Sequence, residues 1–201
     1  MRIIAGRLGG RRLRAPAGQA TRPTSDRVRQ ALFNILGPPP PETWVLDLCA
    51  GAGALALEAL SRGAAGAVVV DSGHAAVRAI QGNVADLGLG AQVRVVQADA
   101  IAALDRLPAT PRFGWVFADP PYRSELAIRL LEALAGRTLL SEEAVVVVEH
   151  DRRQAPLDRH GSLLRTDRRR YGDTELSFYR AERAPPAPST PPPGPSESSD
   201  P

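Results

Sequence analysis

Short apolar runs alternate with longer helical stretches through the middle of this chain, and that alternation restricts the folds it can adopt. The runs are rich in valine and stay apolar at successive positions, which is typical of strands buried on both faces. They span residues 44–48, 67–71, 93–97, 115–119 and 144–149. Because helical patterns fill the gaps, the sequence predicts right-handed βαβ units in a mostly parallel sheet with helices on both sides, a doubly wound, Rossmann-like α/β fold.

The two ends of the chain depart from this alternation. Residues 163–171 and 174–182 flank the pair Gly172-Asp173, and this pattern predicts an antiparallel hairpin that brings the sheet to seven strands. Before the sheet, short apolar pieces broken by glycines predict a small hairpin or extended arm. A helix should follow the arm, with Thr24 or Ser25 as its N-terminal cap.

Prolines divide the chain into segments. Four consecutive prolines follow the predicted N-terminal helix, and the last 18 residues, 184–201, contain eight more and no large apolar side chain. Such a segment has nothing to bury, so we expect it to be disordered. The sequence therefore predicts a basic N-terminal extension over residues 1–37, a main domain over 38–183 and a proline- and serine-rich tail over 184–201.

Composition excludes several classes of protein. At 201 residues and 43% hydrophobic content, the chain can bury one sizeable core. It has no run near the roughly 18 apolar residues of a membrane span, and its N-terminus lacks the apolar core of a secretory signal. Its one cysteine, Cys49, cannot form an internal disulfide and has no partner at metal-ligand spacing. We therefore expect a cytoplasmic protein without a disulfide, a metal site or a membrane segment.

The basic residues are unevenly distributed. All 25 are arginine. Residues 1–29 carry eight arginines and one acid, residues 38–149 carry eight arginines and thirteen acids, and residues 150–183 carry nine arginines and six acids. A mildly acidic body with basic ends favours a polyanionic partner that meets those ends. At a net charge of +3, a solvated arginine surface is the alternative explanation.

The first predicted strand runs into a glycine-containing turn. The sequence "VLDLCAGAGALALEAL" places Asp47 in the strand, Gly51 and Gly53 in the turn, and a helix after them. In an open parallel sheet, ligands bind beyond the carboxyl ends of the strands. Glycines there let backbone amides approach a ligand, and the helix adds its N-terminal donors. The alternative is a tight turn that needs glycine for its geometry only.

Acidic residues close the next two strands. Asp71 is placed to accept hydrogen bonds from the ribose hydroxyls of a nucleoside-containing cofactor, although it could instead cap the following helix. With the glycines, we favour the ligand interpretation. Asp99 could bind an adenine amino group or cap its own helix, and the sequence does not decide between these two roles.

The fourth strand ends in "ADPPY". Asp119 contributes a carboxylate, Pro120 and Pro121 stiffen the backbone and leave carbonyl acceptors, and Tyr122 offers an aromatic face. Such a group can accept hydrogen bonds from an exocyclic amine and stack on the ring that bears it. The alternative, a stiff loop with a solvated tyrosine, leaves a carboxylate at this edge of the sheet unexplained.

These motifs together resemble a known family. "DLCAGAGALALEAL" and "FADPPY" look like class I S-adenosylmethionine-dependent methyltransferases that modify an exocyclic amino nitrogen of a base. The stretches "RIIAGRLGGRRL", "RPTSDRVRQALFNIL", "GALALEALSRGAAGAV" and "YGDTELSFY" resemble, in order, the bacterial 16S rRNA guanine-N2 methyltransferases, the small-subunit rRNA methyltransferase D family. The resemblance covers residues 2–180.

The resemblance implies S-adenosylmethionine as cofactor and assigns roles to matching positions. The methionine part would meet the glycine turn, Asp47 would position its amino end, Asp71 would bind the ribose and Asp99 the adenine. The implied cofactor-binding residues are Asp47, Ala50, Gly51, Gly53, Asp71, Asp99 and Ala100, and the implied catalytic residues are Asp119, Pro120, Pro121 and Tyr122. Two positions depart from the family: Asp71 replaces the more usual glutamate, and Cys49 stands where an aromatic residue is often found.

The implied reaction is methyl transfer to N2 of a guanine in 16S rRNA, within an assembled or partly assembled small subunit. Asp119 and the Pro120 carbonyl would hold the amine, so that positioning and acceptor electrostatics drive the reaction. We expect a monomer that contacts RNA phosphates through arginines. The expected contacts are Arg7, Arg11, Arg12, Arg14, Arg22, Arg27 and Arg29, with Arg168 to Arg170 as a further group.

Three alternatives stay open at this point. A DNA adenine-N6 or cytosine-N4 methyltransferase would use the same Asp-Pro-Pro-Tyr chemistry, although the chain has no region large enough for an obvious target-recognition domain. A protein-glutamine methyltransferase uses a related motif, and the basic arm argues against it. A non-catalytic RNA-binding protein could keep the fold without turnover.

Overall fold

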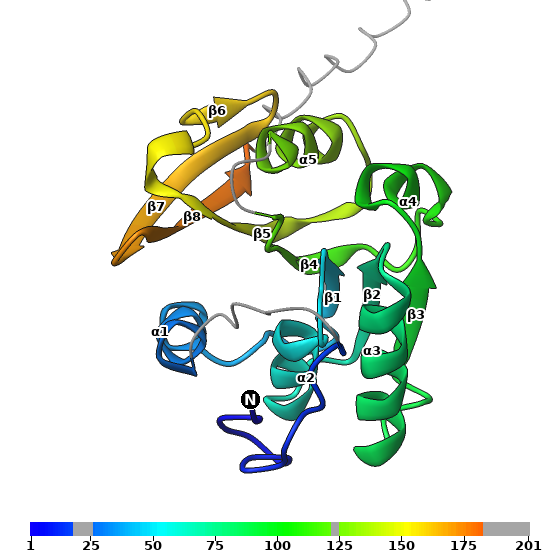
Figure 1. The fold of residues 1–201 in the computed structure, drawn as a ribbon. Coiled ribbons are helices and arrows are strands. Elements are labelled where there is room, and N and C mark those ends of the chain that lie inside the picture. The colour runs from blue at the N-terminus through cyan, green and yellow to red at the C-terminus, as the bar shows by residue number, and fades with distance from the viewer. Residues whose placement is uncertain (18–25, 122–124, 183–201) are drawn as a thin grey trace, which may run out of the picture.

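The computed structural model describes residues 1–17, 26–121 and 125–182. These residues form one eight-stranded sheet with helices on both of its faces (Figure 1). The strands are β1 (Trp44–Leu48), β2 (Gly66–Asp71), β3 (Val93–Gln97), β4 (Phe113–Ala118), β5 (Leu140–Asp151), β6 (Arg159–His160), β7 (Leu163–Tyr171) and β8 (Thr174–Ala181). The helices are α1 (Asp26–Leu36), α2 (Ala54–Ser61), α3 (His74–Asp86), α4 (Ala100–Arg106) and α5 (Leu126–Ala135), with a 3-10 turn, η1 (Arg152–Gln154).

The strand order is β3-β2-β1-β4-β5-β8-β7-β6. Strands β1 to β5 pair in parallel, and the last three strands join them antiparallel. The order reverses between β1 and β4, which places a topological switch point at the carboxyl ends of these two strands. The predicted doubly wound fold with its C-terminal hairpin is therefore confirmed.

The number of strands differs from the prediction. The sheet has eight strands rather than seven because β6, only two residues long, pairs with the start of β7. A strand of two residues has no periodicity to recognise in a sequence. Strand β5 also begins at Leu140, four residues before the predicted start. The prediction missed this start because residues 141–143 are polar and partly or fully exposed.

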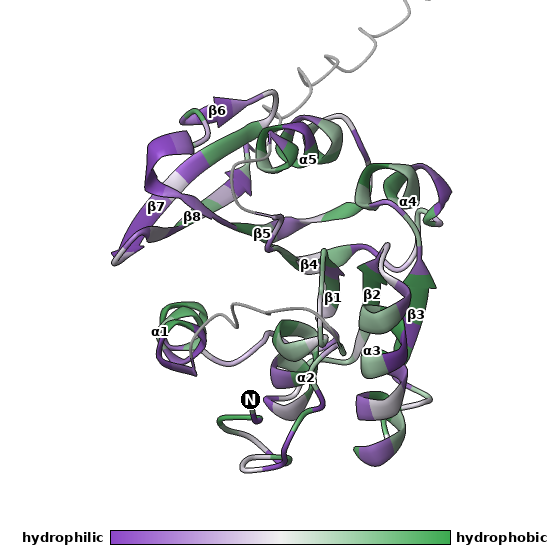
Figure 2. Ribbon diagram, viewed as in Figure 1, coloured by the Kyte–Doolittle hydropathy of each residue, from purple (hydrophilic) through white to green (hydrophobic). Residues whose placement is uncertain are grey.

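The two faces of the sheet bury separate apolar clusters, as strand alternation requires. On β4, Trp115 and Phe117 face α1, α2 and α3, whereas Val116 and Ala118 face α4 and α5. Phe33 of α1 packs with its ring centroid 5.8 Å from that of Phe117. Figure 2 shows β2 in hydrophobic colours and the outer part of β7 in hydrophilic ones, in line with the burial of β2 and the exposure of most of β7.

The N-terminal arm, residues 1–17, folds against α2 and α3 and shares the main core. It begins with a hairpin turn, in which Ile3 N donates to Arg11 O at 2.9 Å and Gly10 N donates to Ile3 O at 2.9 Å. The Ile3 side chain is fully buried in the cluster on the α1 to α3 face. The predicted small hairpin is therefore confirmed, and the core holds it in place.

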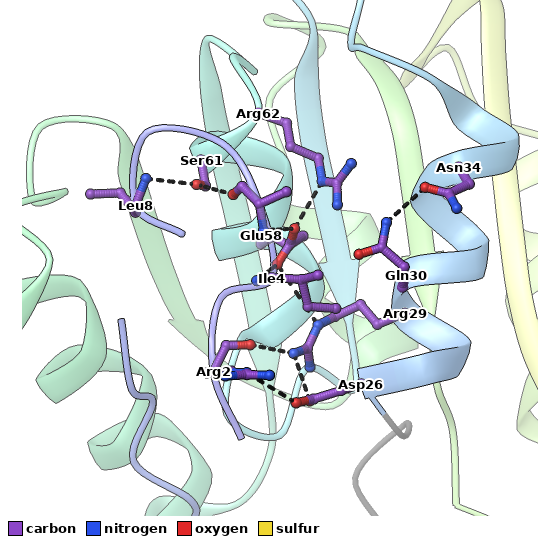
Figure 3. Close-up of polar contacts among 12 residues, drawn as sticks. Arg2, Ile4, Leu8, Asp26, Arg29, Gln30, Asn34, Glu58, Ser61 and Arg62 are labelled. Atoms are coloured by element: carbon purple, nitrogen blue, oxygen red, sulfur yellow. Dashed lines mark hydrogen bonds and ion pairs between the residues drawn. The ribbon is translucent and has the colours of Figure 1, made fainter. Parts of the chain in front are cut away.

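A buried carboxylate holds the arm to α2 (Figure 3). Glu58, which is 0% exposed, accepts hydrogen bonds from Ile4 N at 2.7 Å and Ala5 N at 3.0 Å. The same carboxylate accepts from Arg62 Nε at 2.8 Å, and its Oε2 lies 3.9 Å from Arg29 Nε. Two backbone amides and two guanidinium groups therefore compensate for burying this charge.

Candidate active site

The turn between β1 and α2 has an unusual backbone. Gly51 and Gly53 adopt φ of 59° and 74°, the left-handed region that glycine enters without a Cβ clash. Cys49 adopts φ of 60° although it is not a glycine, so the backbone is strained next to the predicted ligand site. Gly53 caps α2 without a side-chain hydrogen bond. This turn therefore brings the N-terminus of α2 to the switch point.

Asp47 lies behind the turn rather than on the cavity wall. Its carboxylate is 1% exposed, and its Oδ2 accepts a hydrogen bond from Ala56 N at 3.0 Å in the first turn of α2. Burial raises the pKa of Asp47 to about 7; the Ala56 hydrogen bond opposes that rise and the charge of Asp71 adds to it. Asp47 therefore fixes the start of α2 from beneath.

Asp71 joins the two loops at the carboxyl ends of β1 and β2. Its Oδ2 accepts from Gly51 N at 2.8 Å, and its Oδ1 accepts from Gly73 N at 2.8 Å. Helix α3 is capped by Gly73 without a side-chain bond, so Asp71 is not the helix cap that the sequence left as an alternative. Its carboxylate lies where the two loops meet.

Asp99 has the capping role that the sequence left open. Its Oδ1 accepts hydrogen bonds from Ile101 N at 3.0 Å and Ala102 N at 3.1 Å in the first turn of α4. Both bonds go to one carboxylate oxygen. A cap of this kind is compatible with ligand binding because the second oxygen keeps its acceptor sites.

A cavity of about 280 Å³ lies beyond the carboxyl ends of β1 to β4. It brings together side chains that the sequence predicted separately. Its walls are formed by Cys49, Gly51, Asp71, Ser72, Gly73, Ala98, Asp99, Ala100, Asp119, Pro121 and Leu126. Of the predicted cofactor residues, Asp47, Ala50 and Gly53 are not among these lining residues. Sequence reasoning missed Ser72, Gly73, Ala98 and Leu126, which flank the strand-end acids and the Asp-Pro-Pro stretch.

A second cavity, of about 190 Å³, borders the same motif. Pro121 lines both cavities, Asp119 lines only the first, and Pro120 lines only the second. The remaining wall of the second cavity comes from the start of α5, the end of β5 and η1: Glu125, Ala127, Ile128, Glu149, His150, Asp151, Gln154 and Ala155. The Asp-Pro-Pro stretch therefore separates the two cavities, and we call it the partition. Tyr122 lies outside the described residues.

The first cavity is electrostatically negative. Burial, followed by the charges of Asp71, Asp119, Asp47 and Asp99, raises the pKa of the Cys49 thiol to about 12. Four carboxylates thus act on one thiol and disfavour its ionisation to a thiolate. A site with this field suits a ligand that carries positive charge on its reacting group. Among the described residues, no cluster of three or more His, Cys, Asp or Glu side chains could hold a metal ion.

The arginines of the arm are mostly held by intramolecular contacts at the far end of α3. Arg7 bonds Gln92 Oε1 at 2.7 Å, Arg11 bonds Asp86 O at 2.7 Å, and Arg14 bonds the Asp86 carboxylate at 2.8 and 2.9 Å. Since α3 has 13 residues, its ends lie about 20 Å apart. The first cavity is lined by Gly73 at the start of α3, so these guanidinium groups at the other end lie well away from it.

Arg29 requires a correction. Its side chain is 1% exposed, bonds Arg2 O and Asp26 Oδ1, and lies beside Glu58 (Figure 3). A buried guanidinium cannot reach an RNA phosphate, so the predicted contact is wrong and Arg29 instead ties α1 to the arm. Arg12 and Arg27 are exposed. Arg22, like the predicted helix caps and the tail, lies outside the described residues.

The C-terminal hairpin carries the second basic group. Arg168, Arg169 and Arg170 are exposed on β7, one strand from the edge of the sheet. Arg168 lies 3.7 Å from Glu175, and Arg169 lies 2.9 Å from Asp167, so nearby acids offset part of this charge. No helix in the described part of the chain is long and apolar enough to span a membrane.

Comparison with known proteins identifies the family. The family described as conserved hypothetical protein 95 matches residues 1–180. Ribosomal RNA small subunit methyltransferase D of Escherichia coli (strain K12) is 41% identical over 151 residues, 75% of each chain. YlbH of Bacillus subtilis (strain 168), provisionally named an rRNA methyltransferase, is 36% identical over 181 residues, 90% of this chain and 98% of its own.

A solved structure agrees with these relatives. The structure of yhhF from Escherichia coli, provisionally named a methyltransferase, superposes with a TM-score of 0.78 at 34% identity, over 92% of this chain and 99% of that one. The match therefore extends over the sheet, the N-terminal arm and the C-terminal hairpin. The chain belongs to the conserved hypothetical protein 95 family and is a methyltransferase.

Proposed function

We propose that this protein transfers the methyl group of S-adenosylmethionine to the exocyclic N2 of a guanine in 16S rRNA. The observation that carries the proposal is the partition at Asp119 to Pro121, with a negatively charged cavity on one side and a second cavity on the other. The first cavity suits a cationic methyl donor, and the second cavity suits a base that carries an amine. The relatives named as small-subunit rRNA methyltransferases support rRNA as the substrate.

The residues of the first cavity fit S-adenosylmethionine. Its sulfonium and ammonium charges complement the carboxylates of Asp71, Asp99 and Asp119 in the wall, and bound there it would supply an electrophilic methyl group. Asp71 would accept hydrogen bonds from the ribose hydroxyls, and Asp99 from the adenine amine. Gly51 leaves its backbone open to the methionine part because it has no Cβ. Asp47 fixes the start of α2 and adds its charge from behind the wall.

Asp119 and Pro120 would act on the acceptor. The lone pair of a guanine N2 is delocalised into the ring, so the nitrogen is a weak nucleophile. The Asp119 carboxylate and the Pro120 carbonyl can accept hydrogen bonds from the two N–H groups of this amine. These bonds turn the nitrogen lone pair towards the methyl group. Held in this way, the nitrogen would form a bond to the methyl carbon as the carbon–sulfur bond breaks, which would leave S-adenosylhomocysteine. One N–H proton would pass to the Asp119 carboxylate or to water. Catalysis rests on positioning and acceptor electrostatics.

The target base must leave its stack to enter the site, and Tyr122 is proposed to stack against it. Exposed Arg12 and Arg27 are proposed to contact phosphates, and Arg7, Arg11, Arg14, Arg22 and the β7 arginines to extend this contact over an rRNA surface. A small ribosomal subunit, assembled or in assembly, presents such a surface. This partner implies a cytoplasmic enzyme, which we propose to act as a monomer.

A substrate panel tests the proposal. Purified protein and S-adenosylmethionine labelled in the methyl group are incubated with unmodified small subunits, naked 16S rRNA, DNA and a protein extract. We expect label in the small-subunit RNA, and its position is then mapped by fragment analysis. Asp119→Ala serves as the matched inactive protein. Label that enters only DNA or only protein would contradict the proposal.

A further inference from the structure

Glu149 lies beside Asp119 on the neighbouring strand. Strands β4 and β5 are parallel, and their last paired residues are Ala118 and Val148. One residue further along each strand come Asp119 and Glu149. Asp119 directly follows β4 and keeps one hydrogen bond to the sheet, from its N to Leu48 O at 3.4 Å. Neighbouring strands lie about 4.8 Å apart, so the two carboxylates start from adjacent backbone positions.

Both side chains also leave the sheet on the same face. Phe117 and Val147 belong to the core cluster on the α1 to α3 side, whereas Ala118 and Val148 belong to the opposite cluster. Alternation along a strand returns residues 119 and 149 to the face of Phe117 and Val147. Glu149 is 8% exposed and lines the second cavity, while Asp119 lines the first. Two carboxylates, Asp119 just after β4 and Glu149 in β5, therefore border the two cavities.

We propose that Glu149 restricts the reaction to guanine by accepting a hydrogen bond from the ring N1–H. Guanine is the one RNA base in which a ring N–H lies next to the exocyclic amine. Adenine and cytosine carry an unprotonated ring nitrogen at that place. Asp119 can hold the amine of all three bases, but a carboxylate at Glu149 meets a donor in guanine and a lone pair in the other two. This inference rests on the proposed function and explains why the Asp-Pro-Pro stretch alone does not select the base.

The test replaces the target guanine by 2-aminopurine. This base keeps the 2-amino group but has an unprotonated N1, and it is placed at the mapped position in small subunits reconstituted from ligated RNA. A site built to bind a hydrogen-bond donor rejects an analogue that lacks it. We expect kcat/KM of the wild-type protein to be at least about 100-fold higher for guanine than for 2-aminopurine.

Glu149→Gln provides the second arm, because the glutamine amide can donate to an unprotonated N1. In this variant we expect the ratio of kcat/KM for guanine to 2-aminopurine to come within about tenfold of one. Glu142→Gln, at an exposed position on the same strand, should keep the wild-type ratio. Affinity for S-adenosylmethionine and the melting temperature confirm that each variant is folded.

The outcomes separate this inference from the proposed function. Equal wild-type activity on both bases would overturn the role of Glu149, and so would a wild-type ratio in Glu149→Gln. If Glu149→Gln does not fold, the comparison of the two bases with the wild-type protein decides alone. Absence of transfer to guanine-containing subunits, which are assayed first, would overturn the proposed function and this inference with it.

Discussion

Asp47→Asn should make the protein more stable at neutral and alkaline pH. The folded-state pKa of Asp47 is about 7, compared with an ordinary value of 3.8. The folded chain therefore holds this proton more tightly than the unfolded chain. Its contribution to stability is complete below about pH 4 and is lost as the pH rises to about 7. Asparagine has nearly the shape of the protonated carboxyl and can still accept from Ala56 N, but it carries no charge to bury.

The size of the effect follows from the shift. A rise of about three pKa units, at about 1.36 kcal/mol for each unit, corresponds to about 4 kcal/mol. The free energy of unfolding of Asp47→Asn minus that of the wild type should therefore be near zero at about pH 4. It should rise by about 1.4 kcal/mol per pH unit and level off near pH 8.

Urea denaturation of the cofactor-free protein at a series of pH values measures this difference. Subtracting the wild-type curve removes the contribution of every other titrating group that the substitution leaves unchanged. Asp173→Asn is the matched control, since it removes the same charge from a side chain that is 70% exposed. A flat difference for Asp47→Asn across the pH range would refute the reasoning that burial dominates the environment of this carboxylate.

Three further predictions concern catalysis, folding and RNA binding. Asp119→Ala should keep the Kd for S-adenosylmethionine, measured by calorimetry, within a few-fold of the wild-type value and should lower kcat by about 100-fold or more. A fall in cofactor affinity as large as the fall in kcat would assign Asp119 to cofactor binding. Glu58→Gln should lower the free energy of unfolding by about 3–5 kcal/mol in urea, because Arg29 and Arg62 lose their buried counter-charge; a loss below about 1 kcal/mol would show that the network contributes little. Arg12→Ala should weaken binding to small subunits and reduce the salt slope by about one; an unchanged slope would remove Arg12 from the RNA contacts.

The fold was predictable because its central strands β1, β2 and β4 are buried on both faces, which gives continuous apolar runs. Strands β1, β3 and β7 have the bounds that the sequence predicts. The early start of β5 was not predictable from apolar residues, because polar residues at 141–143 separate Leu140 from the valine run. Strand β6 exists through its pairing with β7 rather than through a pattern of its own.

Part of the site followed from topology, and the rest depended on side-chain direction. Acids at the ends of parallel strands meet at one edge, so the gathering of Asp71, Asp99 and Asp119 around one cavity was predictable. The sequence does not show that Asp47 turns beneath α2. Charge counting likewise places Arg29 among the RNA contacts, although its helix position faces the buried Glu58. Both misplacements concern charged side chains that turn towards buried partners, Ala56 N for Asp47 and Glu58 for Arg29, and no sequence pattern reports that direction.

Identification of the methylated base tests the central claim most directly. Small subunits methylated by the purified protein are digested to nucleosides, and the labelled nucleoside is compared with standards by liquid chromatography and mass spectrometry. The site predicts N2-methylguanosine, formed by the wild-type protein and absent with Asp119→Ala. Label in N6-methyladenosine or N4-methylcytidine would contradict the assignment of Asp119 and Glu149 to a guanine edge.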